Sequence, residues 1–354
     1  MSSAQSMTFA EAVRDGLAEA LAADEGVLCY GLGVTDPKGV FGTTLELEER
    51  FGKERVFDMP TSENAMTGIA IGAALDGMRP IMCHQRLDFF LLALDQLVNN
   101  AAKWHYMFGE QASIPLTIRL IVGRGWGQGP SHSQNLQAWF AHVPGLKVLA
   151  PSTPSDAKGL LLSAVFDDNP VIFLEHRWLH NVRGEVPAGD FRVPIGKACR
   201  LREGDDVTIV SFSHMTVEAL HAVPTLEAHG ISCDVIDLRS LRPVDYGAVF
   251  ESVERTGRLL ALDTGYGEVS MAGEIVARVS MERFGSLKTA PRRLALPPVP
   301  TPTSPALTRV FYPRAEDIVR EVGKLAGIPI ATEEIASQRE HPHDVPGDWF
   351  TGPF

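Results

Sequence analysis

The alternation of helical and strand-like segments is the feature that most constrains the fold of this chain. Helical apolar spacing in TFAEAVRDGLAEALAA is followed by the short apolar run GVLCYGLGV, and the exchange recurs with TGIAIGAALDG and RPIMCHQ. Apolar strands separated by helices are typical of parallel sheets covered by helices on both faces. We therefore predict an α/β fold built around parallel sheets.

A weakly periodic segment divides the chain. A length of 354 residues favours two domains. Residues 181–203 (NVRGEVPAGDFRVPIGKACRLRE) carry several Pro, Gly and charged residues, so we interpret them as a linker. The linker would separate a first domain at 7–180 from a smaller domain at 204–330. Residues 331–354 form a polar, Pro-rich tail, either disordered or docked on a neighbour.

Composition and charge exclude several classes of function. The formal net charge is -12, with acids and bases interspersed, so neither a nucleic-acid-binding stripe nor a polybasic membrane anchor is expected. No apolar run approaches the roughly 20 residues of a membrane span, and the start lacks the pattern of a signal peptide. The four cysteines are far apart with no CxxC, which argues against a zinc site or a disulfide framework. We expect a cytoplasmic protein without a nucleic-acid or membrane partner.

One acid, Glu63, lies in an unusual context. It stands in DMPTSENAMTGIAIGAAL, between small polar residues and a run of glycine, alanine and isoleucine. Glu63 in a first helical turn would be favoured by the helix dipole, capped by Ser62 and turned to water. The alternative is a buried carboxyl group, which is costly unless something binds it.

Three separated stretches occur in a characteristic order: SENAMTGIAIGAALDGMRP, SHSQNLQAWFAHVPGLKVLAPSTPSDAKGLL and DVIDLRSLRPVD. Together they resemble the beta subunit of the first, decarboxylating component of 2-oxo-acid dehydrogenase complexes of the pyruvate and branched-chain type, in the transketolase-like superfamily. The likeness runs from about residue 7 to about residue 326. It implies a parallel-sheet domain that binds the pyrimidine of thiamine diphosphate and a smaller transketolase C-terminal-like domain.

The resemblance also implies a partner chain. In this family the cofactor is held between the beta subunit and an alpha subunit. The motif GDG, which together with a later Asn binds magnesium and the diphosphate, does not occur in this sequence. We therefore expect an alpha subunit that carries GDG and Asn and holds most of the magnesium, in an alpha2beta2 assembly. A lipoyl or similar carrier domain would accept the acyl group.

The family's motifs map onto four residues. The resemblance implies that Glu63 hydrogen-bonds to the aminopyrimidine ring and activates the cofactor, with Ser62 beside it. Phe89, in a long helix predicted over residues 89–107, would stack on the aminopyrimidine. His132, in the glycine-rich GPSHSQ, would stabilise charge or transfer protons next to the substrate. A loop histidine is otherwise commonly just a solvated side chain.

Asp167 and Asn169, in FDDNPV, are similar to part of the family's potassium site. Their hard oxygen ligands suit such an ion. An ordinary Asp/Asn turn before a strand explains the same residues.

Two stretches depart from the family pattern. Gly31-Leu32-Gly33 stands where the family usually carries an acidic pair that helps to connect paired active sites, so that coupling is in doubt. Cys83-His84-Gln85-Arg86 replaces a strand that reads roughly Glu-Phe-Met.

The second departure supplies candidate substrate residues. His84, Gln85 and Arg86 precede Phe89, and Arg124 lies in the loop that leads to His132. The arginines either pair with acids in a subunit interface or bind an anionic or hydroxylated donor, such as a sugar phosphate. A further polar group after a strand, EHRWLH, would support the same cleft through His176, Arg177, Trp178 and His180.

Three functions are compatible with these features. The first is the beta subunit of a thiamine-diphosphate-dependent 2-oxo-acid dehydrogenase that passes an acyl group to a carrier. The second is a transketolase-like enzyme that transfers a two-carbon unit from a ketose or ketose phosphate. The third is a non-catalytic assembly subunit, which the presence of Glu63, Phe89 and His132 disfavours.

Overall fold

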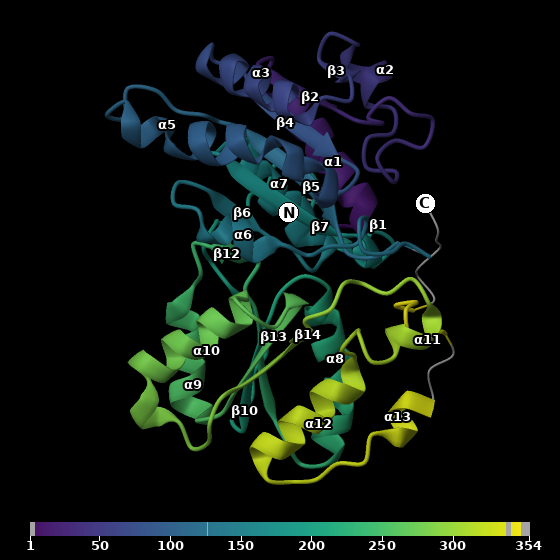
Figure 1. Cartoon of the computed structure of the whole chain (residues 1–354), viewed down its shortest axis with the longest axis vertical. Coiled ribbons are helices and arrows are strands. Elements are labelled where there is room, and N and C mark those ends of the chain that lie inside the picture. Colours follow the sequence, from purple (N-terminus) through teal and green to yellow (C-terminus); the bar gives the residue numbers. More distant parts are fainter. Residues whose placement is uncertain (1–3, 126, 338–340, 348–354) are drawn as a thin grey trace.

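The computed structural model describes residues 4–125, 127–337 and 341–347. Two α/β units lie one above the other along the long axis of the molecule (Figure 1). The upper unit contains a seven-stranded sheet and the lower unit a five-stranded sheet. The predicted α/β class with two parallel-rich sheets is thus confirmed. No helix among these residues is long and apolar enough to cross a membrane.

The upper sheet has the strand order β12-β6-β7-β5-β4-β2-β3 and is parallel except for β12. All residues of β5 and β7 are buried, as their continuous apolar character requires. The strands are β2 (Val27–Gly31), β3 (Val56–Asp58), β4 (Arg79–His84), β5 (Thr117–Val122), β6 (Lys147–Leu149), β7 (Val171–His176) and β12 (Ser240–Arg242).

Helices cover both faces of this sheet. One apolar cluster joins Ile118 and Leu120 of β5 to Met66 of α3, and another joins Ile121 of β5 to Leu17 of α1. A capping box, in which Thr8 and Glu11 bond reciprocally, starts α1 where the sequence predicts a helix. The helices are α1 (Phe9–Ala23), α2 (Leu47–Phe51), α3 (Glu63–Leu75), α6 (Gln137–His142), α7 (Pro154–Val165) and the 3-10 turn η3 (Arg177–Leu179).

The single long helix predicted over residues 89–107 is wrong in detail. The segment is helical for most of its length, but its hydrogen-bond pattern changes along it. A polar side chain competes for the backbone here, since Asn100 Nδ2 donates to the backbone carbonyl of Asp95 at 3.4 Å. The pieces are α4 (Leu87–Phe90), the 3-10 turn η1 (Leu91–Ala93), the π-helical η2 (Gln96–Ala101) and α5 (Ala102–Met107).

The lower sheet has the order β14-β13-β10-β11-β9. Its central strands β10, β11 and β13 carry the apolar runs that predict them. The strands are β9 (Cys199–Arg202), β10 (Val207–Ser211), β11 (Cys233–Asp237), β13 (Leu259–Tyr266) and β14 (Arg292–Leu296). The helical segments are α8 (His214–Ala228), α9 (Tyr246–Thr256), α10 (Met271–Glu282), η4 (Phe284–Ser286), α11 (Pro305–Thr308), α12 (Ala315–Ala326) and α13 (Glu333–Ser337).

The predicted linker at 181–203 contains two strands. β8 (Arg183–Val186) pairs with the N-terminal β1 (Gln5–Thr8), and β9 pairs with β11. Both strands lie at sheet edges and are partly exposed, so they lack the apolar run by which buried strands are found. The segment is therefore part of two sheets rather than an unstructured connection.

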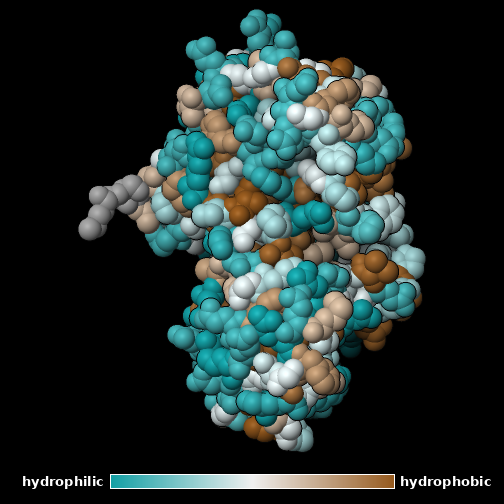
Figure 2. Space-filling model, turned by 90° about the vertical axis from the view of Figure 1, so that its left-hand side faces the viewer, coloured by the Kyte–Doolittle hydropathy of each residue, from teal (hydrophilic) through white to brown (hydrophobic). Residues whose placement is uncertain are grey.

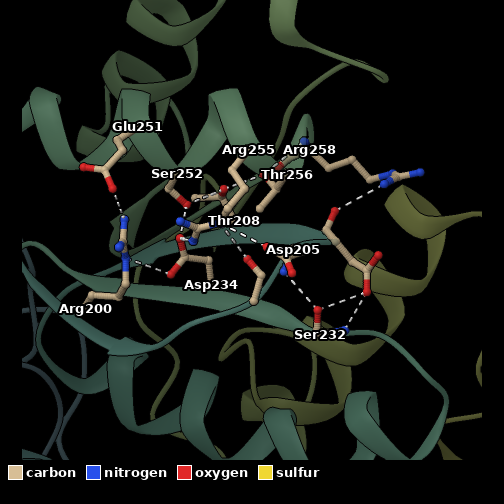
Figure 3. Close-up of polar contacts among 12 residues, drawn as sticks. Arg200, Asp205, Thr208, Ser232, Asp234, Glu251, Ser252, Arg255, Thr256 and Arg258 are labelled. Carbon is tan, nitrogen blue, oxygen red and sulfur yellow. Dashed lines mark hydrogen bonds and ion pairs between the residues drawn. The ribbon is translucent and has the colours of Figure 1, made fainter.

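A buried acid organises the lower unit. Asp234 of β11 is fully buried, and it accepts a hydrogen bond from Ser252 and ion pairs from Arg200 and Arg255 (Figure 3). Thr208 of β10 continues the network by bonding to Ser252. A buried carboxylate is tolerated only when it is paired in this way, so this network ties α9 to the sheet.

The two units share a core at the waist of the molecule. After β11 the chain crosses to the upper sheet, where β12 pairs antiparallel with β6. Leu146, Leu241 and Val249 then belong to one continuous apolar cluster. On the face shown in Figure 2, hydrophobic side chains gather at the narrowing between the two parts.

Candidate active site

Glu63 is the first residue of α3, and only 5% of its surface is exposed. Ser62, at the preceding position, is exposed, and its side chain makes no capping hydrogen bond within the described part of the chain. The explanation of Glu63 as a capped, water-facing acid is therefore wrong. Among the described residues, the Glu63 carboxyl group has no hydrogen-bond or ion-pair partner.

Glu63, Phe89 and His132 all follow the carboxyl ends of parallel strands of the upper sheet. Glu63 comes after β3, Phe89 after β4, and His132 after β5. Such ends lie on one edge of a parallel sheet, which is where α/β proteins bind ligands. Sequence order and sheet topology thus bring the three residues to the same edge.

Side-chain contacts join the elements at this edge. The rings of Phe89 and His132 meet edge to face, with centroids 5.2 Å apart. Gln134 donates to Asp88 Oδ1 at 2.8 Å, which links the loop after β5 to α4. Asn64 Nδ2 lies 3.4 Å from Leu92 O, which links α3 to η1.

The sequence's two departures from the family pattern touch each other. A Cβ atom added at Gly33, where φ is +75°, would lie 2.4 Å from Nε2 of Gln85. An acidic side chain therefore cannot stand at position 33 while Gln85 keeps this place.

The two candidate substrate arginines are buried and bonded within the chain. Arg86 Nη1 donates to Gly123 O at 3.0 Å, and its Nη2 donates to Gln128 Oε1. Burial, with the nearby Arg177, lowers the pKa of Arg86 to about 10. Arg124 donates to Thr303 O at 2.9 Å and pairs with Asp344 at 2.9 Å. Arg124 thus pairs with an acid of its own chain.

His84 is also buried, with its ring edge-on to Phe90 at 4.9 Å. Burial lowers the pKa of His84 to about 4, so the imidazole is neutral near pH 7. Neither ring nitrogen has a hydrogen-bond partner within the described residues. The position is apolar in character.

The EHRWLH segment lies between the two units. The rings of His176 and His214 stack with centroids 5.1 Å apart, and Trp178 meets His214 at 4.8 Å. His180 instead faces Glu175, with 3.5 Å between Nε2 and Oε2. The segment therefore connects the upper unit to α8 of the lower unit.

Sequence reasoning missed the buried pair of Arg119 and Glu175. Arg119 Nε donates to Glu175 Oε1 at 2.7 Å beneath the site. Burial acts to raise the pKa of Glu175, but Arg119 and His180 outweigh it and lower that pKa. The available signal was a charge inside each of two apolar strands, since charges are rarely buried unless paired.

Asp167 and Asn169 form a turn. Asp167 Oδ1 accepts from the backbone and side-chain nitrogens of Asn169 at 2.9 and 3.2 Å. Its Oδ2 pairs with Lys147, and Arg79 donates to its backbone carbonyl at 3.2 Å. Within the described residues, no group of three or more His, Cys, Asp or Glu could hold a metal ion.

Two cavities lie away from this edge. One of about 1000 Å³ and one of about 410 Å³ open at the waist, between α6 and the elements of the lower unit. Neither is lined by Glu63 or His132. The edge bearing Glu63 is therefore identified by the chemistry of its residues.

Two known family models match this chain, one over the upper unit and one over the lower unit. Residues 5–182 match the family described as "Transketolase, pyrimidine binding domain", and residues 196–318 match "Transketolase, C-terminal domain". The chain belongs to the transketolase family.

Within this family, the chain is similar to beta subunits of thiamine-diphosphate-dependent dehydrogenases. It is 44% identical to the acetoin:2,6-dichlorophenolindophenol oxidoreductase subunit beta of Cupriavidus necator, over 81% of this chain and 84% of that one. It is 41% identical to the pyruvate dehydrogenase E1 component subunit beta of Rhizobium meliloti, over 89% and 69%. It is 39% identical to the 2-oxoisovalerate dehydrogenase subunit beta of Bacillus subtilis, over 90% and 98%.

A solved structure supports the transketolase fold. It is described as "Split gene transketolase, inactive beta4 tetramer", with a TM-score of 0.73 and 23% identity. The match covers 92% of this chain and 99% of that one. At this identity the likeness concerns the fold alone.

Proposed function

We propose that this chain is the beta subunit of a two-subunit, thiamine-diphosphate-dependent 2-oxo-acid dehydrogenase. The observation that carries the proposal is Glu63, a buried carboxyl group without a partner among the described residues. A buried carboxyl group is costly unless it is bound. A nitrogen of the cofactor's aminopyrimidine ring would supply the missing partner.

The residues at the sheet edge fit that group. Glu63 holds and shares a proton at the ring nitrogen, and the aromatic face of Phe89 packs on the ring. His132, edge to face with Phe89, stabilises charge or moves a proton on the substrate. When bound, thiamine diphosphate supplies the carbon nucleophile and stabilises the charge left by bond cleavage.

The rest of the enzyme is proposed to come from other chains. The sequence contains no GDG, so an alpha subunit with GDG and a later Asn would bind the diphosphate and magnesium. We propose an alpha2beta2 assembly that passes its acyl group to a lipoyl or similar carrier domain. A potassium ion at the turn of Asp167 and Asn169 would have to displace Lys147 from Asp167 Oδ2 and Arg79 from the Asp167 carbonyl, so we do not propose that site.

A hydroxyketone is the second candidate substrate. Arg86 and Arg124 are each only 2% exposed and already bond to acceptors within the chain, so neither guanidinium is presented to a substrate in this arrangement. This favours a neutral donor, and two relatives are named for acetoin. It weakens the reading of His84, Gln85, Arg86 and Arg124 as a site for a ketose phosphate.

The decisive substitution is Glu63→Gln in the complex reconstituted with its alpha subunit. Pyruvate, 2-oxoisovalerate and acetoin are each supplied, with 2,6-dichlorophenolindophenol as electron acceptor. Turnover should fall by roughly 10² to 10⁴-fold, the contribution of a positioned acid–base group, while the complex still assembles. Glu48→Gln, an exposed acid on α2, is the matched control and should keep full activity. Unchanged turnover by the Glu63→Gln complex would reject the proposed role.

A further inference from the structure

The loop that carries His132 has little stiffness of its own. It joins β5 to α6, and its described residues are 123–125 and 127–136. Gly123 and Gly127 have φ of +77° and +71°, a region that glycine enters without steric cost. A glycine-rich loop loses more entropy on ordering, so contacts from outside must fix His132.

The first part of the loop is held from α4. Arg86 donates to Gly123 O and to Gln128 Oε1, and the same oxygen accepts from Gly125 N at 3.0 Å. Only 2% of Arg86 is exposed. This contact lies within the upper unit.

Arg124 anchors the loop from the opposite direction. Its guanidinium pairs with Asp344 of the C-terminal segment at 2.9 Å and donates to Thr303 O at 2.9 Å. The two paired side chains are only 2% and 9% exposed. Breaking one partner of a buried ion pair is strongly destabilising, because it leaves an uncompensated charge.

The segment 341–347, which we call the C-terminal strap, is itself seated on the lower unit. His343 Nε2 lies 2.8 Å from Tyr312 O, and Arg314 donates to Pro346 O at 3.2 Å. Val345 packs on a small apolar cluster made by Trp178, Leu296, Phe311 and Tyr312. The strap follows α13 and meets the waist near α11, at the right of Figure 1.

We propose that the C-terminal strap is a positioning element for the active-site loop, acting through the ion pair of Asp344 and Arg124. The strap lies beyond the region that matches the transketolase family, which ends at residue 318. Arg124 and Asp344 are positioning residues, because they act on His132 through the loop backbone. The link to catalysis rests on the proposed function, but the link to loop order does not.

Hydrogen exchange of the full-length chain tests loop order. In Asp344→Asn, the amides of residues 127–134 should exchange at least about tenfold faster, as expected when a buried partner is lost. The amides of β5 should stay protected, which shows that the sheet remains folded. Asp190→Asn breaks an exposed pair with Arg192 by the same chemical change and should leave the loop unaltered. His343→Ala, a milder variant outside the pair, should loosen the same amides to a smaller extent.

Kinetics of the reconstituted complex test positioning. For Asp344→Asn, kcat should fall about tenfold while the apparent affinity for thiamine diphosphate is unchanged, and Asp344→Glu should restore part of kcat. Unchanged loop exchange in both Asp344→Asn and His343→Ala overturns the proposal, and so does faster exchange with an unaltered kcat. If the parent complex turns over none of the tested substrates, the proposed function fails, whereas hydrogen exchange still decides the role of the strap.

Discussion

At the scale of single residues, buried polar groups in this protein fall into two kinds. Arg119 and Glu175 are fully paired, and the pair is held by several hydrogen bonds. Both ring nitrogens of His84 are buried without a hydrogen-bond partner within the described residues. Glu63 is 5% exposed, and its carboxyl group has no partner among those residues. A buried polar group without a hydrogen-bond partner lowers the free energy of unfolding unless a ligand supplies the partner. Glu63 lies at the sheet edge where we propose the cofactor binds, whereas the His84 ring packs on Phe90.

His84 gives stability a defined dependence on pH. Its pKa is about 4 in the folded chain, against about 6.5 for the unfolded group. Below pH 6.5 the unfolded state binds the proton first, so stability is lost as pH falls from about 6.5 to about 4. His84→Phe removes this term and should recover about 3 kcal/mol of the loss at pH 4, measured by urea unfolding across that range.

At pH 7.5, His84→Phe should be as stable as the parent or about 1 kcal/mol more stable, because it removes two buried ring nitrogens that have no hydrogen-bond partner within the described residues. His229→Phe, at an exposed position of the lower unit, serves as the control and should retain the parent's pH dependence. An equal pH slope in His84→Phe and the parent would contradict the assignment.

At the scale of elements, α3 carries apolar side chains on its exposed face as well as on its buried face. Met66, Ala70 and Ala74 face the core, while Ile69 is 58% and Leu75 38% exposed. A Cβ added at Gly72 would meet open space. Exposed apolar surface next to a binding site is typical of an interface. Since Glu63 begins this helix, its outer face is where we expect the partner chain that completes the cofactor site.

Ile69→Arg should therefore weaken assembly without unfolding the chain. A charge placed in an apolar interface is desolvated without a partner, so we expect the alpha subunit to bind at least about tenfold more weakly. Sedimentation velocity of mixtures measures this, and circular dichroism checks the fold. Ile328→Arg, just after α12 and 39% exposed, is the matched control. Equal assembly of the two variants would exclude α3 from the interface.

At the scale of the whole molecule, the two units are interlocked. The chain returns from the lower sheet to add β12 to the upper one, and Leu241 of β12 lies in the shared apolar cluster. The stacked rings of His176 and His214 make a second connection. Units joined through a common core are expected to unfold together.

Leu241→Ala should lower the free energy of unfolding by about 2–5 kcal/mol, the cost of a cavity in a packed core. Because Leu241 serves both units, the whole unfolding transition should shift, as seen by urea denaturation and calorimetry. Leu307→Ala, at a position 56% exposed, should have little effect. Two separate transitions of which only one moves would show that the units are independent.

The sequence by itself determined the α/β class and the buried strands, and its resemblance to a known family predicted Glu63, Phe89 and His132 as site residues. The strands have a local signal, because apolar runs identify β5 and β7, whereas the roles of Glu63, Phe89 and His132 remain predictions from the resemblance. The burial of Phe90 likewise agrees with its apolar helical context.

Only the tertiary structure decided which distant segments meet. The edge strands within 181–203, the crossing of β12 and the pairing of Arg124 with Asp344 have no local signature. Of the predicted tail at 331–354, residues 338–340 and 348–354 lie outside the described residues, and 341–347 dock on this same chain. Edge pairing and buried ion pairs depend on the approach of residues far apart in sequence, which local composition does not encode.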